Sequence, residues 1–441
     1  MKISQDIEIR TVDGRKFDML AGETVEVVMG GFSLLDLSLR SASYTTAFQL
    51  PRTPTNESIL EFASETTRYN RPDIEIFARF GTRDMYGYMK VVSFGKTYSV
   101  TLKFTDFINA MSGFELNEII DDISNPIFSG TSYQDAINKM TASGKYTFFH
   151  SYSTETYPIL PDMGIFINQG EIISMICVKS GYTSVLGAGV DLSAKFLFCR
   201  DWYYEVLAMG GGVFDVNVKA GVKKQYKSIS VLLKQLCLAN GLYFTVDEMS
   251  KTVTFSKIES LITTTPVYIE TLTLKEKQLY TGHGRNNTIK YSVVEGITSV
   301  TKYATFTADG ATSKEALQLE ILIPSKIGGI HNLTDVTDLV VASREGTKYD
   351  ITYDYNGGGY YLSVNTEYLT IPNLAPVYAF MQTVFGDTFI ITVEGYINSL
   401  QIESIMSGRV IRSVALGGTY FVEALNYNIN TGKTVAKLIK L

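Results

Sequence analysis

Alternating apolar and polar residues recur along most of the chain, in short runs separated by turn residues. Ile7–Val12 alternates in this way and is followed by Asp13-Gly14, a dipeptide typical of hairpin turns. Such a period of two is that of a strand with one buried face. The pattern predicts further extended segments at 24–29, 44–50, 74–80, 89–94 and 98–104, and later at 288–293, 317–323, 349–355, 360–364, 388–395, 401–405, 410–416, 420–426 and 434–439.

One segment changes to the helical period. Within Ser228–Glu259, apolar side chains recur at helical spacing from Ile229 to Ala239, after Ser228 as a helix cap and before Asn240-Gly241 as a stop signal. Two short alternating runs then follow at 242–246 and 252–256. The segment therefore predicts a helix packed on one face of a β-hairpin.

Other helices and the boundaries between domains are predicted from weaker signals. Short helices are expected at 56–64, within 106–122, and from Ser132 to Gly144. The stretch 146–222 is aromatic and rich in glycine, and we expect it to be irregular with few strands. Asn125-Pro126 indicates a boundary. The predicted division is an N-terminal β-barrel-like domain at 1–126, a middle inserted domain at 127–226, a helix plus β-hairpin module at 227–295, and a C-terminal β domain at 296–441.

Length and composition favour a multidomain, mainly β protein with minor α, an α+β architecture. The 441 residues suffice for about two to four domains. Apolar residues make up 45% of the chain, and the 28 Tyr and 24 Phe favour strands. The net charge of −6 argues against a protein that neutralises nucleic-acid phosphates. No run approaches the roughly 20 apolar residues of a membrane-spanning helix, and no secretion signal is expected.

Neither catalysis nor a cofactor site is indicated by any motif. The adjacent carboxylates Asp121-Asp122 and Asp247-Glu248 are sequence neighbours, whereas a glycosidase needs two carboxyl groups across a cleft. Gly187-Ala188-Gly189 lacks the third glycine of a dinucleotide-binding turn. We therefore predict no catalytic and no cofactor-binding residue, and no enzyme.

Metal binding is not indicated either. Cys177, Cys199 and Cys237 form no C-x-x-C pair, and none of the histidines (His150, His283 and His331) lies near them in sequence. We expect three buried free thiols. Asp350, Asp354 and Asn356 form at best a loose acidic hairpin without the spacing of a calcium loop. No metal ligand is predicted.

Asp36–Asn56 carries Arg, Ser, a strand, Leu-Pro-x-Thr and Asn in that order. Five further blocks lie at 105–122, 228–259, 280–291, 420–427 and 432–441. In this order, the blocks resemble the tail hub, or baseplate hub, proteins of phages and prophages of Bacteroides-like hosts, and Asp36–Asn56 is the most specific of them. The stretch 146–222 lies outside the resemblance.

The resemblance implies a ring-forming structural protein of the virion tail. Such a hub has two β-barrel-like domains around a symmetry axis, with peripheral domains outside, and carries no catalytic residues. Its implied partners are further copies of itself in a trimer or hexamer and the tube, spike, tape-measure or adaptor proteins of the tail. DNA would pass through the lumen without specific binding. Synthesis would take place in the cytoplasm of the bacterial host. The closing strand Thr434–Ile439 would pair within a barrel next to the axis.

Two alternatives stay open at this stage. A tail adhesin that binds a receptor or glycan could use Trp202 and exposed tyrosines of 146–222 for stacking on sugars. An adhesin would need a free binding tip, whereas a hub would need a ring. An enzyme acting on glycans would need two convergent carboxylates, and the sequence does not place such a pair.

Overall fold

The computed structural model describes residues 7–34, 40–41, 43–61, 73–80, 83–104, 107–112, 114, 118–119, 127–148, 165–198, 202–208, 211–220, 229–247, 250–279, 286–291, 304–307, 318–321, 323–324, 340–345, 350–354, 359–363, 368–370, 374–385 and 389–441. Strands outnumber helices, and they are distributed over several sheets. The prediction of a mainly β, multidomain architecture with minor α is confirmed.

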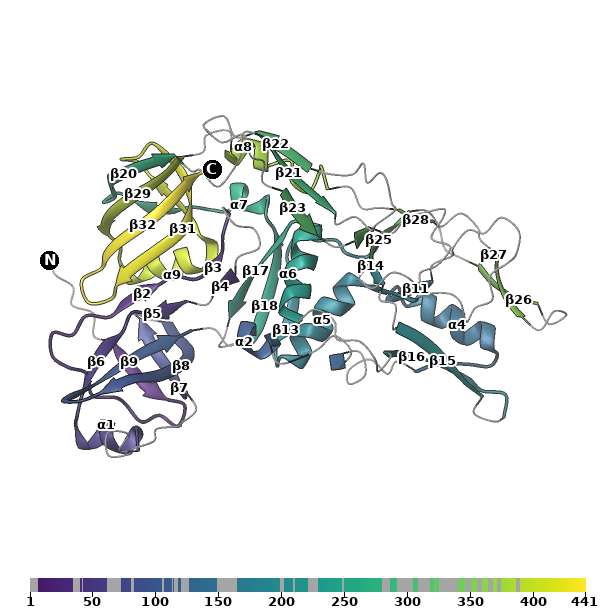
Figure 1. The fold of residues 1–441 in the computed structure, drawn as a ribbon, viewed down its shortest axis with the longest axis horizontal. Coiled ribbons are helices and arrows are strands. Elements are labelled where there is room, and N and C mark those ends of the chain that lie inside the picture. The colour runs from purple at the N-terminus through teal and green to yellow at the C-terminus, as the bar shows by residue number, and fades with distance from the viewer. Residues whose placement is uncertain are drawn as a thin grey trace.

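The N-terminal unit is a curled antiparallel sheet closed off by one short helix (Figure 1). Its elements are β1 Glu8–Thr11, β2 Glu26–Val28, β5 Tyr44–Thr45, β6 Phe48–Pro51, α1 Pro54–Ile59, β7 Ile74–Phe80, β8 Arg83–Phe94 and β9 Thr97–Lys103. The residues predicted to share one face of β9, from Tyr98 to Phe104 at every second position, are all buried. Helix α1 begins earlier than expected, because Thr53 caps it and Pro54 fits its first turn.

The C-terminal unit is built from the last strands of the chain together with a strand pair from its middle. Its elements are β19 Val267–Ile269, β20 Thr273–Leu279, β29 Phe389–Tyr396, α9 Ser399–Gly408, β30 Val410–Ser413, β31 Gly418–Asn428 and β32 Lys433–Lys440. The predicted closing strand is β32, and it pairs with β29 on one side and β31 on the other. The two units form one sheet because β2 pairs with β31, with Val27 opposite Tyr427.

The expectation of barrel-like domains is corrected in one respect. In the described residues no sheet closes into a barrel through its strand pairings. In the C-terminal unit the two ends of the sheet are β19 and β20, which residues 270–272 connect along the chain. The sheet therefore curls round a core without a ladder across its seam.

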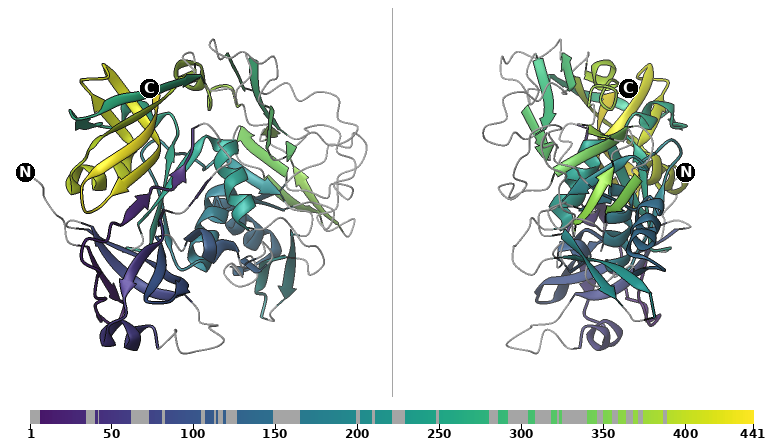
Figure 2. Two further views of the ribbon diagram at one scale, coloured as in Figure 1. Left: turned by 60° about the vertical axis from the view of Figure 1, so that its left-hand side comes forward. Right: turned by 90° about the vertical axis from the view of Figure 1, so that its right-hand side faces the viewer.

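The central module packs beside both units, as Figures 1 and 2 show. Its elements are β3 Gly31–Phe32, β4 Arg40–Ser41, α2 Phe107–Ser112, α5 Gln169–Lys179, β13 Thr183–Leu186, α6 Ile229–Asn240, β17 Leu242–Asp247, β18 Thr252–Lys257, α7 Ser260–Thr263 and α8 Met381–Phe385. The predicted helix, strand and returning strand of 228–259 are confirmed as α6, β17 and β18. Strand β13 adds to this hairpin in parallel to β18.

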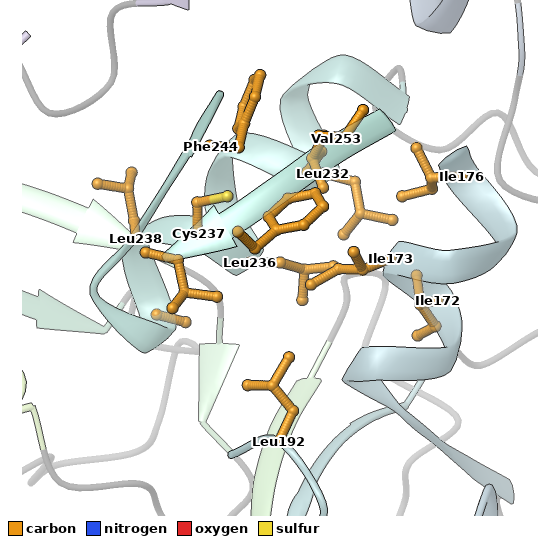
Figure 3. Close-up of a cluster of buried hydrophobic side chains, with 14 of the residues drawn as sticks. Ile172, Ile173, Ile176, Leu192, Leu232, Leu236, Cys237, Leu238, Phe244 and Val253 are labelled. Atoms are coloured by element: carbon orange, nitrogen blue, oxygen red, sulfur yellow. The ribbon is translucent and has the colours of Figure 1, made fainter. Parts of the chain in front are cut away.

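Helices α5 and α6 meet over this small sheet. Figure 3 shows Ile173 of α5 and Leu236 of α6 side by side, with Phe244 and Val253 from the two strands of the hairpin. All four side chains are buried. The apolar face that the sequence predicts for α6 is therefore covered on one side by α5 and on the other by the hairpin.

Further sheets lie beside the module, most of them on its side away from the two units (Figure 1). One sheet contains β10 Ile127–Gly130, β15 Trp202–Ala208 and β16 Phe214–Ala220, and it lies next to α4 Tyr133–Ala142. A second sheet contains β11 Tyr146–Phe148, β12 Ile165–Asn168, β14 Lys195–Phe198, β24 Ile323–Pro324, β25 Val340–Glu345 and β28 Tyr368–Thr370. Two smaller sheets are formed by β21 Asn286–Tyr291 with β22 Ala304–Thr307 and β23 Gln318–Ile321, and by the hairpin of β26 Asp350–Asp354 and β27 Gly359–Ser363.

Two local expectations are wrong. The stretch 146–222 is not irregular, because it holds α5 and six strands. Helix α5 buries Ile172, Ile173 and Ile176 on several sides, so its sequence lacks the polar face by which an amphipathic helix is recognised. Residues 401–405 are not a strand but part of α9, which begins with a capping box between Asn398 and Gln401.

Strand pairings connect the predicted domains. Strand β13 of the segment 127–226 pairs with β18 of 227–295, β14 pairs with β25 of 296–441, and β2 of 1–126 pairs with β31. The predicted boundaries stay a prediction.

Candidate functional site: the buried junction around Arg409

The strands of the C-terminal unit are buried on both faces where the central module covers them. Tyr420 and Val422 belong to the hydrophobic cluster shared by the N- and C-terminal units, whereas Phe421 between them belongs to the cluster of the central module. Leu438 and Ile439 divide in the same way. Because neighbouring residues of a strand point to opposite faces, β31 and β32 separate two hydrophobic cores.

Phe32 of strand β3 joins the module to the C-terminal unit. Its ring lies 5.7 Å from that of Tyr243 on β17 and 6.2 Å from that of Phe421 on β31, the latter edge to face. Phe32 and its neighbour Leu34 are buried, with exposed fractions of 3% and 0%. A segment from the beginning of the chain is therefore held between the module and the last strands.

Arg409 holds the backbone of this segment. It follows α9 as its C-cap, and its φ of 55° is left-handed. Its guanidinium donates hydrogen bonds to the carbonyl oxygens of Phe32 and Gly30 and, at 3.5 Å, to that of Met29. The guanidinium carbon also lies 5.8 Å from the centre of the Phe421 ring. Since the planar fork presents several donors at once, one side chain satisfies successive carbonyls of an extended segment.

Glu423 supplies the opposite charge and holds the same segment at one side-chain hydroxyl and one backbone nitrogen. Its carboxylate accepts a hydrogen bond from the Ser33 hydroxyl and one of 3.0 Å from the Leu34 backbone nitrogen. Burial lowers the pKa of Arg409 to about 10, and the charge of Glu423 acts in the opposite direction. The guanidinium thus stays charged at neutral pH.

The arrangement is suited to holding structure together rather than to chemistry. Arg409 and Glu423 bind donors and acceptors of residues 29–34, mostly from the backbone, and the Phe421 ring lies beside the guanidinium. A buried polar network of this kind fixes one arrangement of its elements strongly once all of its members are paired. Neither residue was predicted from the sequence, although a lone Glu423 among the apolar residues of 420–425 is a signal for a buried partner.

The Leu-Pro-x-Thr and Asn motif of the resemblance is also structural. Thr53 accepts a hydrogen bond of 3.2 Å from the Asn56 backbone nitrogen and so caps α1. The fully buried Asn56 side chain donates to the carbonyls of Asp18 and Pro51, each at 2.9 Å, and accepts one from the Asp18 backbone nitrogen. Arg52 pairs with Glu57 at 2.5 Å. The motif therefore forms a corner that fixes the loop after β1.

Among the described residues, those weighed for chemistry are not brought together. Asp247 ends β17 and is exposed, and Gly187 and Gly189 form the turn after β13. Cys177 and Cys237 are buried free thiols on α5 and α6, and burial raises the pKa of Cys177 to about 12. The following lie outside the described residues: Asp121, Asp122, Glu248, Cys199, Asn356, His150, His283, His331 and the boundary at Asn125-Pro126.

No group of three or more His, Cys, Asp or Glu side chains in the described part of the chain is arranged to hold a metal ion. Strands β26 and β27 form the predicted hairpin around 356–359, although the side chains of Asp350 and Asp354 are not described. Among the helices described, none has the length and apolarity to cross a membrane. The prediction of no catalytic, cofactor or metal residue stays a prediction.

Comparison with known proteins finds similar solved structures, among them three tail proteins. The chain matches no protein-family model and no curated protein. It is similar to the 43 kDa tail protein of prophage MuSo2 from Shewanella oneidensis, at 9% identity and a TM-score of 0.42, over 99% of this chain and 98% of that one.

Two further structures that are similar to this chain are also tail proteins. The prophage tail protein gp18 from Listeria monocytogenes EGD-e matches at 8% identity and a TM-score of 0.43, over 99% of this chain and 94% of that one. The tail protein from Neisseria meningitidis MC58 matches at 7% identity and a TM-score of 0.41, over 98% and 96%. TM-scores below 0.5 at such identities do not establish a common fold.

Proposed function

We propose that this protein is a structural component of a phage or prophage tail, and specifically a ring-forming hub of the baseplate. The proposal starts from the ordered sequence blocks that resemble tail hubs over nearly the whole chain. Its partners are further copies of the same chain and neighbouring tail proteins. Its location is the virion tail, after synthesis in the host cytoplasm.

The observation that carries the proposal is the fusion of the two β units that the resemblance implies. The N- and C-terminal units share one sheet through β2 and β31 and one hydrophobic cluster. The sheet of β10, β15 and β16 and the hairpin of β26 and β27 lie outside them, on the far side of the central module (Figure 1). A ring subunit transmits load between neighbours, and pairing the first and last parts of the chain keeps its two β units in one fixed relation.

The surface of the C-terminal unit also supports self-association. Tyr396 and Leu400 are 63% and 62% exposed, and Tyr268 is 58% exposed. The backbone segments that carry them lie close together, because the Gln401 side chain donates to the Tyr268 carbonyl at 2.8 Å and Thr271 donates to the Tyr396 carbonyl at 2.6 Å. Grouped apolar side chains that are exposed on a monomer favour a protein contact.

The first test is the mass of the purified chain in solution and in virions. Native mass spectrometry of the recombinant protein should give a closed trimer or hexamer, and quantitative mass spectrometry of purified particles should give a small fixed number of copies. Substitution of Leu400→Asp should dissociate the ring, whereas Val12→Asp, at another exposed apolar position, should not. Absence of the chain from particles would contradict the proposal.

The tail-adhesin alternative makes a different prediction. An adhesin would bind a host glycan or receptor through 146–222 as an isolated chain, without a ring. The side chain of Trp202 lies outside the described residues, so we propose no binding site there. Glycan-array binding by the monomer would favour the adhesin over the hub.

A further inference from the structure

The N-terminal unit, the C-terminal unit and the central module contact one another in pairs. The junction between the N-terminal unit and the central module differs from the other two. The N- and C-terminal units share a sheet and a hydrophobic cluster, and the C-terminal unit shares a second cluster with the central module. In the described residues, neither cluster combines side chains of β7, β8 or β9 with those of α6 or its hairpin. The N-terminal sheet and the module therefore meet without a common core.

At this third junction Lys251, from the tip of the β17–β18 hairpin, reaches across to the N-terminal sheet. Its ammonium nitrogen lies 4.4 Å from the centre of the Tyr86 ring on β8 and 4.8 Å from that of Tyr182, at the start of β13. It also donates a hydrogen bond of 3.2 Å to the Tyr182 hydroxyl. Both ring distances are within the range of cation–π attraction.

The two rings on either side of the lysine are braced by further aromatic contacts. Tyr86 lies 5.5 Å from Phe77 and 5.8 Å from Tyr88, ring centre to ring centre. Tyr182 packs edge to face on Phe107 at 5.0 Å, inside the cluster of the module. Each ring thus belongs firmly to its own part of the molecule, and Lys251 links the two parts.

The backbone of Lys251 is held in an unfavourable conformation. Its φ of 50° is left-handed, a region that favours glycine or asparagine over lysine. Its carbonyl accepts a hydrogen bond of 2.8 Å from the Thr183 backbone nitrogen, at the start of β13. The turn at the hairpin tip and the hydrogen bond from Thr183 together fix the direction of the Lys251 side chain. A lysine occupies this turn although its backbone conformation favours glycine.

We propose that Lys251 is a latch that fixes the central module against the N-terminal sheet. Opening of the latch lets the module reorient about its junction with the C-terminal unit, at Phe32, without opening either hydrophobic cluster. Among the described residues, the other two junctions bury large apolar side chains, whereas at this one a cation lies between two rings. The proposal is independent of the hub function.

The test measures the distance between the N-terminal sheet and the module in the full chain. Spin labels at V92C on β8 and V185C on β13, both exposed positions, report this distance by pulsed electron resonance, in a background without other reactive cysteines. Lys251→Met removes the charge and keeps much of the length, and it should raise the ratio of open to closed arrangements about tenfold. Lys251→Arg keeps a cation and should match the unsubstituted chain.

Tyr86→Leu tests the latch from the other side. It leaves the hairpin unchanged and should broaden the same distance distribution as Lys251→Met does. A narrow, unchanged distribution in both variants would overturn the proposal. Broadening that accompanies a loss of circular dichroism would also overturn it, because Lys251 would then be needed for folding rather than for holding one orientation.

Discussion

Replacement of Arg409 by alanine should locally destabilise the junction between the beginning of the chain and its last strands. Arg409 is 7% exposed and donates to carbonyls of the segment 29–32, two of which lie closer than that of Met29 at 3.5 Å. A hydrogen bond that involves a charged group contributes roughly 1.5–3 kcal/mol. Two such bonds give about 3–6 kcal/mol. Removing one partner of a buried charged network costs a similar amount, about 3–5 kcal/mol.

Two further variants separate the guanidinium from the backbone. Arg409→Lys keeps the charge but loses the planar fork that bonds two carbonyls at once. Its loss of local stability should therefore be smaller than that of Arg409→Ala. Arg409→Gly removes the side chain but relieves the left-handed φ of 55°. Glycine should therefore be less destabilising than alanine, by about 1 kcal/mol.

Hydrogen exchange is the suitable assay, because a chain of several parts does not unfold in one step. The exchange of β3 and of the 418–423 part of β31 gives the local free energy of opening, and α1 serves as a distant reference. Exchange at β3 that is unchanged to within about tenfold in Arg409→Ala, or about 1.4 kcal/mol, would refute the reasoning. So would a glycine variant that is less stable than the alanine variant.

Four other outcomes follow from the structure. Phe32→Ala should cost about 3–5 kcal/mol at the same junction by hydrogen exchange, because it removes a buried ring between two aromatic partners. Burial raises the pKa of Cys177 from 9.0 to about 12 and that of Tyr427 from 10.0 to about 12, so the folded state keeps protons that the unfolded state releases. Stability should then fall as the pH rises from about 9 to 12, and Cys177→Ala should reduce the slope in thermal melts. Gly241→Ala should destabilise α6 in hydrogen exchange, because the φ of 61° is left-handed and a Cβ would meet Val377. Asn398→Ala should lower the local stability of α9 by about 1 kcal/mol, since it removes the capping box.

The parts of the fold that the sequence predicts correctly are those with complete local signals. The α6 hairpin follows from apolar residues at helical spacing, a serine before them and Asn240-Gly241 after them. Gly241 indeed has the positive φ of a helix stop. The single-sided burial of β9 follows from strict alternation. In each case the information lies within one short window of sequence.

Two helices were missed because their windows are ambiguous. Helix α5 is covered on several sides, so its isoleucines show no polar stripe and resemble a buried strand. In α9 the apolar Leu400 and Ile402 alternate with Gln401 and Glu403 like a strand, although the buried pair is Ile402 and Ile405, at helical spacing. Asn398 and Gln401, which have the spacing of a capping box, predict the helix better than the apolar pattern does.

The junction around Arg409 could not be predicted from any window, because it depends on a layer that distant residues supply. Within the sequence of β30 the sign of this junction is a pair of adjacent apolar residues, Val410 and Ile411, and within that of β32 it is Leu438 and Ile439. Adjacent side chains on a strand point in opposite directions, so such a pair can be buried only if both faces of the sheet are covered. In this chain one face is covered by the shared core of the two β units and the other by the central module. Apolar pairs within otherwise alternating strands therefore indicate where a second layer packs on a sheet. They do not indicate which segment supplies that layer, because this depends on contacts between distant residues, such as those of Phe32.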